Sequence, residues 1–210
     1  MEYFDKGGNY NVPLNYAKEA FLNSDPKKMA MFSNSHYDED SSTFKIKCMD
    51  MNLYVKYPSG EIFYEDNTRL NQISLEILII RFLVNANPVP ESHKYITFKE
   101  IDGGHVYYPA FLKTSINRLI SNFGNDIKTF ETVMEKIGST KLNMGDCSYK
   151  IRFINDTYVV YVIWQGDDEM EPNGNILFDS NIKYYFNAED IAVIGDMPFI
   201  RTFKELDKIK

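Results

Sequence analysis

The segment Tyr158-Val-Val-Tyr-Val-Ile-Trp164 runs directly into Gln165-Gly-Asp-Asp-Glu-Met-Glu-Pro172, and this stretch is the most informative part of the chain. Its first part is continuously apolar, which is typical of a strand buried on both faces. Its second part brings a glycine and four carboxylates to the end of that strand. Packing a core does not require so much negative charge there, so the run is either a site or a heavily solvated turn.

Further strands are expected on both sides of this segment, because short apolar or alternating runs recur between turn signals. They are expected at residues 43–48, 52–57 and 61–64, which we interpret as an antiparallel meander, at 95–98, at 149–153, and at 176–178 paired with 182–186. Helical patterns cover residues 15–22, 74–86, 111–123 and 127–137. Other helices are expected to start at Pro26, with Asp25 as N-cap, and at Asn187, and a last one to lie near Leu206.

The order of these elements predicts the fold class. Strands come in runs rather than alternating one for one with helices, which favours an α+β fold with mainly antiparallel sheet. The sequence has no linker rich in Pro, Gly or Ser and no internal repeat. We therefore expect residues 1–210 to form a single α+β domain.

Composition limits the class of protein and of partner. Hydrophobic content of 44% and aromatic content of 15% are typical of a globular protein. The net charge of −7 disfavours nucleic acid and anionic membranes as partners, because binding to phosphates needs a basic surface. No signal-peptide pattern is present and the longest apolar stretch, 75–84, is too short to span a bilayer, so we expect a cytoplasmic protein. Cys48 and Cys147 are then expected to be free thiols, and two cysteines alone cannot hold an iron–sulfur cluster.

Three acidic side chains at the strand end, Asp167, Asp168 and Glu169, are the candidate metal ligands. Hard cations such as magnesium or calcium prefer carboxylate and carbonyl oxygens, although the spacing does not match a calcium-binding loop. Crowded carboxylates also raise one another's pKa, which offers a general acid. The alternative is an acidic turn whose carboxylates accept hydrogen bonds from the backbone and pair with nearby Lys or Arg.

Two other segments are candidates for the same site. In Asp102-Gly-Gly-His105 the glycines let the backbone approach a ligand and form an anion nest, and the histidine suits proton transfer or metal ligation; the alternative is a structural turn. Asp179 ends an apolar run, where it either caps the next turn or shares a site with the acidic run. We expect all three segments to converge on one cleft beside Trp164. The predicted ligand-binding residues are Gly103, Gly104, His105, Trp164, Gly166, Asp167, Glu169 and Asp179.

The remaining features are less specific. Gly145-Asp146-Cys147 is interpreted as a plain turn, and a cysteine beside an aspartate is not expected to be an activated thiolate. The tyrosines either wall a pocket for a flat ligand or pack in the core. No Walker loop, dinucleotide-binding glycine pattern, zinc-protease motif, serine-hydrolase motif or paired C-x-x-C occurs, so the corresponding enzyme classes have no support.

Several motifs, in their order along the chain, carry a resemblance to a known family. They are Ile96-Thr-Phe-Lys-Glu-Ile-Asp-Gly-Gly104, Gly145-Asp146, Trp164-x-Gly-Asp-x-Glu169, Ile176-Leu-Phe-Asp179 and Ala188-Glu-Asp190. With these motifs the chain resembles, over nearly its whole length, the family catalogued as domain of unknown function 3786. The resemblance implies a cytoplasmic protein of an anaerobic bacterium or archaeon. Some relatives carry an added cysteine-rich iron–sulfur segment, as in corrinoid proteins, and this sequence has no such segment.

Three functions are compatible with these observations. The preferred hypothesis is a non-catalytic binding or accessory module for a small molecule or metallocofactor, with a corrinoid as one candidate ligand suggested by the relatives. The second is an enzyme that uses the carboxylate cluster and a divalent metal ion. The third is an interaction protein whose motifs are structural. The sequence leaves the reaction, if any, the partners and the oligomeric state open.

Overall fold

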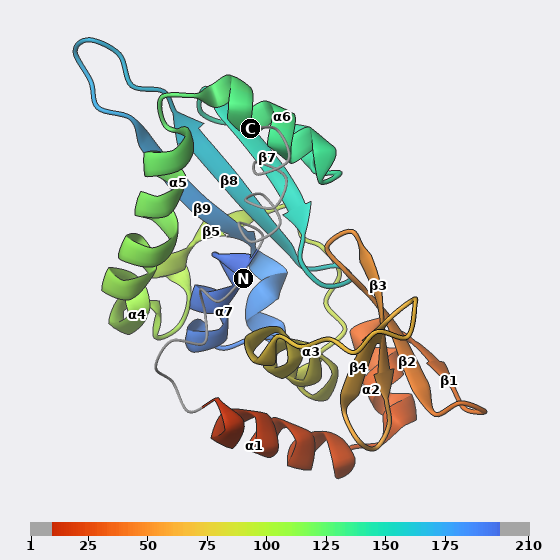
Figure 1. Cartoon of the computed structure of the whole chain (residues 1–210). Helices are drawn as coiled ribbons and strands as arrows, with labels where there is room; N and C mark the ends of the chain where they lie inside the picture. Colours follow the sequence, from red (N-terminus) through yellow and green to blue (C-terminus); the bar gives the residue numbers. More distant parts are fainter. Residues whose placement is uncertain (1–9, 198–210) are drawn as a thin grey trace. The chain divides into compact units, whose positions relative to one another are not determined.

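The computed structural model describes residues 10–197, and the chain divides into two compact units between Val89 and Pro90. Each unit combines helices with one antiparallel sheet (Figure 1), so the predicted α+β class is confirmed. That the two units together form the single domain expected from the sequence stays a prediction. No helix among residues 10–197 is long and apolar enough to cross a membrane.

The first unit is built on a four-stranded meander with the strand order β1-β2-β3-β4. Its elements are α1 (Asn11–Leu22), α2 (Pro26–Ser33), β1 (His36–Asp38), β2 (Thr43–Cys48), β3 (Met51–Lys56), β4 (Glu61–Tyr64) and α3 (Ile73–Asn85). The predicted meander is therefore confirmed. Asp25 is the N-cap of α2, as expected, because its carboxylate accepts hydrogen bonds from the backbone N–H groups of Lys27 and Lys28 at 2.8 and 3.1 Å.

Strict alternation of apolar and polar residues gives this sheet one buried face. Phe44, Val55 and Ile62 lie side by side in the register of β2, β3 and β4, and all three are fully buried. On the opposite face the Lys56 ammonium lies 4.5 Å from the centre of the Phe63 ring. Helix α3 is buried nearly all round and packs against α1 and α2, which explains why its sequence is apolar on almost every side.

The second unit is built on a five-stranded antiparallel sheet with the strand order β5-β9-β8-β7-β6. Its strands are β5 (Tyr95–Thr97), β6 (Thr140–Leu142), β7 (Cys147–Arg152), β8 (Tyr158–Trp164) and β9 (Asn173–Asp179). Its helices are η1 (Phe98–Glu100), α4 (Gly104–Phe111), the π-helix η2 (Leu112–Ile116), α5 (Asn117–Phe123), α6 (Ile127–Lys136), η3 (Ser180–Tyr184) and α7 (Ala188–Ile194).

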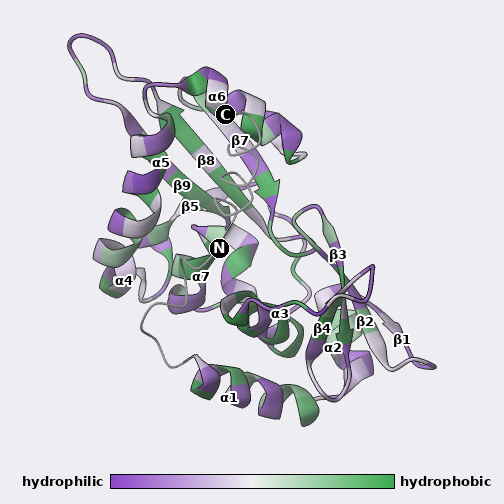
Figure 2. Ribbon diagram, in the orientation of Figure 1, coloured by the Kyte–Doolittle hydropathy of each residue, from purple (hydrophilic) through white to green (hydrophobic). Residues whose placement is uncertain are grey.

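The predicted buried strand, β8, is one of the inner strands of this sheet and is flanked by β7 and β9. Aromatic rings fill the space between sheet and helices: the Phe98 and Phe111 rings stack with centres 4.3 Å apart, and the Phe111 and Phe178 rings lie 6.0 Å apart. Figure 2 shows the inner strands as hydrophobic and the connection from β8 to β9 as hydrophilic. The continuous apolar run of β8 is thus explained by burial.

Two expectations about elements differ from the structure, and a third falls outside the described residues. The predicted strand at 182–186 is wrong, because residues 182–184 belong to the 3₁₀ helix η3, and the Ile182 carbonyl accepts backbone hydrogen bonds from Tyr185 and Phe186. Strands β1 and β6 lie where no strand was expected, and each is a three-residue edge strand with mostly exposed side chains. The expected helix near Leu206 lies outside the described residues.

Candidate functional site

The acidic run forms an exposed loop that joins β8 to β9 and projects from one end of the sheet (Figure 1). One oxygen of Asp167 accepts hydrogen bonds from the backbone N–H groups of Glu169 and Met170, both at 2.8 Å. These two bonds hold the pKa of the Asp167 carboxyl below its usual value. Its carboxylate is thus used to shape the loop itself.

Two turns that contain glycine contact the start of this loop. Gln165 donates its backbone N–H to the Asp146 carboxylate at 2.8 Å, and the Gly166 N–H points at the Gly124 carbonyl at 3.4 Å. Gly145 has a positive φ of 58°, and a Cβ placed there would lie 2.7 Å from the Ile163 carbonyl oxygen. The structure therefore brings Trp164 and Gln165 next to the Gly145-Asp146 turn, and Gly166 next to Gly124, whereas the sequence predicts Gly145-Asp146-Cys147 as a plain turn.

The carboxylates of the loop do not gather around a common point. Asp168 and Glu169 are exposed, and the Asp167 carboxylate faces the backbone N–H groups of its own turn. Within residues 10–197, no three His, Cys, Asp or Glu side chains are placed to hold a metal ion. The predicted metal site at Asp167, Asp168 and Glu169 is accordingly not formed by the described residues.

Asp179 lies at the opposite end of β9 and is completely buried. Its carboxylate accepts hydrogen bonds from the N–H groups of Ser92, His93 and Asn181 at 3.0, 2.7 and 3.0 Å, and from the Ser92 hydroxyl at 2.8 Å. It therefore fastens the segment before β5 to the end of β9 and caps η3. A seven-residue strand spans roughly 20 Å, so Asp179 does not share a site with the Asp167 loop.

The Gly103-Gly104 turn begins α4 and serves close packing. Gly103 has a positive φ of 78°, and a Cβ on Gly104 would lie only 2.2 Å from the Phe98 carbonyl oxygen. The Gly104 N–H already donates to the Ile101 carbonyl at 2.8 Å, which leaves no open anion nest at that residue. His105, next to it, is exposed.

The predicted convergence of these segments on one cleft is wrong. Helices α4, η2 and α5 follow one another without a break from Gly104 to Phe123, which at about 1.5 Å per residue separates their ends by roughly 28 Å. His105 lies at the start of this column and the acidic loop at its far end, beside Gly124 (Figure 1). Nor do the tyrosines form a shared wall: Tyr161 is buried and donates to the Gly195 carbonyl, whereas Tyr184 is exposed.

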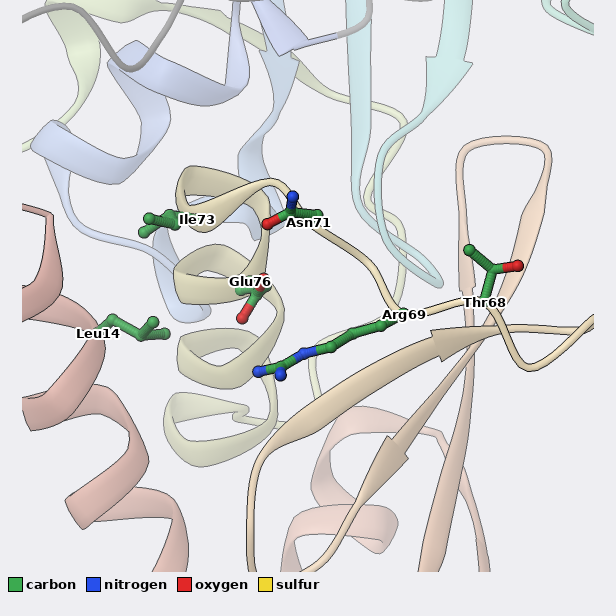
Figure 3. Close-up of a pocket in the computed structure, with 6 residues that line it drawn as sticks. All are labelled: Leu14, Thr68, Arg69, Asn71, Ile73 and Glu76. Atoms are coloured by element: carbon green, nitrogen blue, oxygen red, sulfur yellow. The ribbon is translucent and has the colours of Figure 1, made fainter.

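A pocket that sequence reasoning missed lies in the first unit. It is a depression open to solvent with a volume of about 610 Å³, which is within the usual range of small-molecule sites. Figure 3 shows the Glu76 and Arg69 side chains pointing toward one another, with Leu14 on the facing side of α1. The lining residues are Leu14, Thr68, Arg69, Asn71, Ile73 and Glu76.

The segment after β4 positions Arg69. Asp66 accepts the Thr68 N–H at 2.8 Å, and the chain then returns along β4 so that Arg69 forms a β-bridge with Phe63. One nitrogen of the guanidinium lies 3.5 Å from a Glu61 carboxylate oxygen, in an ion pair that is open to solvent. The Arg69 side chain therefore keeps an accessible face toward the pocket.

Glu76 supplies the opposite charge from the first turn of α3. The residue is only 4% exposed, and burial raises the pKa of its carboxyl, opposed by the positive charges of Lys18 and Arg69 and by a backbone hydrogen bond from Gln72. No ion pair engages the Glu76 carboxylate among residues 10–197. The signal in the sequence was a carboxylate within an otherwise apolar helix, which is rare for a fully buried helix.

Comparison with known proteins agrees with the resemblance found from the motifs. No curated protein and no solved structure matches the chain. The family model described as Domain of unknown function (DUF3786) matches residues 25–200, and so includes Arg69 and Glu76 as well as the Gly103-Gly104 turn and the acidic loop. Since the match extends over most of the 210 residues, the chain belongs to the DUF3786 family.

Proposed function

We propose that this protein is a non-catalytic binding module that holds a small organic ligand in the pocket of its first unit. The observation that carries the proposal is a buried carboxylate, Glu76, facing a solvent-accessible guanidinium, Arg69, across a pocket to which Leu14 and Ile73 add aliphatic side chains. Convergent polar groups beside apolar side chains are what fixes and holds a ligand in a small-molecule site. An ionisable group with a raised pKa in such a place adds support.

The chemistry of the lining favours an organic ligand over a metallocofactor. The described lining contains no histidine or cysteine, which are the side chains that most often bind transition metals. The proposal therefore keeps the binding module predicted from the sequence but not a corrinoid as its ligand. The negative net charge supports a small molecule rather than nucleic acid as the partner. A cytoplasmic location is part of the proposal, supported by Cys48 and Cys147, which are both buried and form no disulfide bond among the described residues.

The test is a fragment screen read out at the pocket itself. Protein with ¹³C-labelled Leu and Ile methyl groups is titrated with a library of small fragments, and the signals of Leu14 and Ile73 are followed by NMR. We expect saturable shifts of these two signals with a subset of fragments. In Leu14→Trp, which fills the pocket, the Ile73 signal should no longer shift, whereas in Val12→Trp, at an exposed position of the same helix outside the pocket, both signals should still shift. A library that never moves either signal would refute the proposal.

A further inference from the structure

One positively charged and one negatively charged side chain line the pocket, Arg69 and Glu76, and this limits the ligands it accepts. Arg69 places a guanidinium at the pocket, and Lys18 adds a second positive charge close enough to lower the pKa of Glu76. Glu76 places a carboxylate on the side of the pocket formed by α3. On the opposite side of the pocket, Glu61 is paired with Arg69. Charged groups that face a binding site from both sides favour a ligand with the complementary arrangement.

A ligand with a single charge fits this arrangement poorly. A simple anion paired with Arg69 would lie near the Glu76 carboxylate, and a simple cation paired with Glu76 would lie near Arg69 and Lys18. Like charges at such distances repel, and the repulsion grows where the site is partly shielded from water. A dipolar ligand meets an opposite charge at each end instead.

The apolar part of the lining indicates what joins the two charged ends. Leu14 from α1 and Ile73 from α3 present aliphatic side chains to the same space. Burying an aliphatic group of a ligand against them is favourable in proportion to the area removed from water. Asn71 and Thr68 add groups that both donate and accept hydrogen bonds.

We infer that the pocket binds a small zwitterion with an aliphatic body, of the α-amino acid class. In this arrangement the ammonium group of the ligand faces Glu76, its carboxylate faces Arg69, and its aliphatic side chain contacts Leu14 and Ile73. This inference rests on the proposed function and adds the chemical class of the ligand.

L-leucine is the probe, and two analogues that each lack one charge are the comparison. Isocaproate keeps the carboxylate and the aliphatic body, and isopentylamine keeps the amine and the body. Titration into the methyl-labelled protein should show saturable binding of leucine at the Leu14 and Ile73 signals. Each analogue should bind at least about tenfold more weakly, because each loses one charge-assisted hydrogen-bonding group.

Two variants assign the charged ends. Glu76→Gln should weaken leucine binding by about tenfold or more and strengthen isocaproate binding, because it removes the like charge. Arg69→Gln should likewise weaken leucine binding and strengthen isopentylamine binding. Glu65→Gln and Lys28→Gln, at exposed positions of the same unit outside the pocket lining, are the matched controls and should bind leucine like the parent. Far-UV circular dichroism of each variant establishes that it is folded.

The outcomes separate this inference from the proposed function. If fragments move the Leu14 and Ile73 signals but leucine does not, or if leucine and both analogues bind equally, the ligand class is wrong and the binding function stands. If neither the fragments nor leucine shift the Leu14 and Ile73 signals, both the ligand class and the proposed binding function are refuted. The analogue series uses the unaltered protein, so a variant that fails to fold does not remove the test.

Discussion

The substitution Asp179→Asn tests how the second unit is held together. The aspartate is fully buried, and its two oxygens accept hydrogen bonds from Ser92, His93 and Asn181. The asparagine amide would keep one oxygen and turn an NH₂ group toward the donors that the other oxygen served. At least one backbone N–H would then be buried without an acceptor. The loss of a charge-assisted bond together with an unsatisfied donor costs about 3 to 5 kcal/mol.

This cost is large enough to measure with little ambiguity. For a chain of this size about 1 kcal/mol corresponds to roughly 2 to 4 °C in melting temperature, so the variant should melt about 6 to 20 °C lower. Urea unfolding followed by circular dichroism gives the change in the free energy of unfolding. Amide hydrogen exchange at Ser92, His93 and Asn181 locates it, because these amides should lose protection before the rest of the sheet.

Asp168→Asn is the matched control, because it makes the same chemical change in the exposed loop. It should alter the free energy of unfolding by less than about 0.5 kcal/mol. If the two variants melt within about 2 °C of each other, where Asp179→Asn is expected to melt at least about 6 °C below the parent, the hydrogen bonds of Asp179 contribute no net stability and the structural role assigned to it is wrong.

Three further predictions follow from close contacts and from pKa shifts. Gly104→Ala should lower the free energy of unfolding by about 3 kcal/mol or more, measured by urea unfolding, because its Cβ would overlap the Phe98 carbonyl oxygen. Burial and the nearby Glu131 carboxylate raise the pKa of Cys147 to about 11, so iodoacetamide at pH 8 should label its thiol about a hundredfold more slowly than in urea-unfolded protein, as mass spectrometry will show. Burial raises the pKa of Glu76 in the folded state, so its contribution to stability is greatest below the unfolded pKa and is lost as pH rises through the folded pKa. The free energy of unfolding of Glu76→Gln, measured by urea unfolding between about pH 4 and pH 8, should not show this loss. If the parent and the variant show the same pH dependence, the raised pKa is wrongly assigned to Glu76.

Local patterns predicted the elements whose burial is regular. The alternation in β2 and β3, the apolar run of β8 and the apolar helix α3 each indicate the correct element, because one face or all faces of it are buried. The segment 182–186 was predicted as a strand because Ile182 and Phe186 are both apolar, and both are in fact buried. A spacing of four residues between apolar side chains fits a helical turn as well as a strand. The short edge strands carry almost no buried side chains and so leave no pattern to detect.

The site was harder to predict than the fold, because the chemical character of residues does not show how far apart they lie in the structure. Asp167, Asp179 and the Gly103-Gly104 turn are chemically suited to one site, yet the sheet and the α4–α5 helix column place them roughly 20 to 28 Å apart. The pocket, in contrast, combines Leu14 from α1 with residues that lie more than fifty positions later. Only Glu76 carried a detectable signal, as a carboxylate within an apolar run, and its partner Arg69 carried none.

The β-bridge between Phe63 and Arg69 has a consequence for affinity. Because the Arg69 backbone is paired with β4, folding has already removed the backbone freedom that an arginine on an open loop would lose when a ligand arrives. A preorganised anchor of this kind lowers the entropic cost of association. Even a ligand with few atoms is therefore able to stay bound in this pocket.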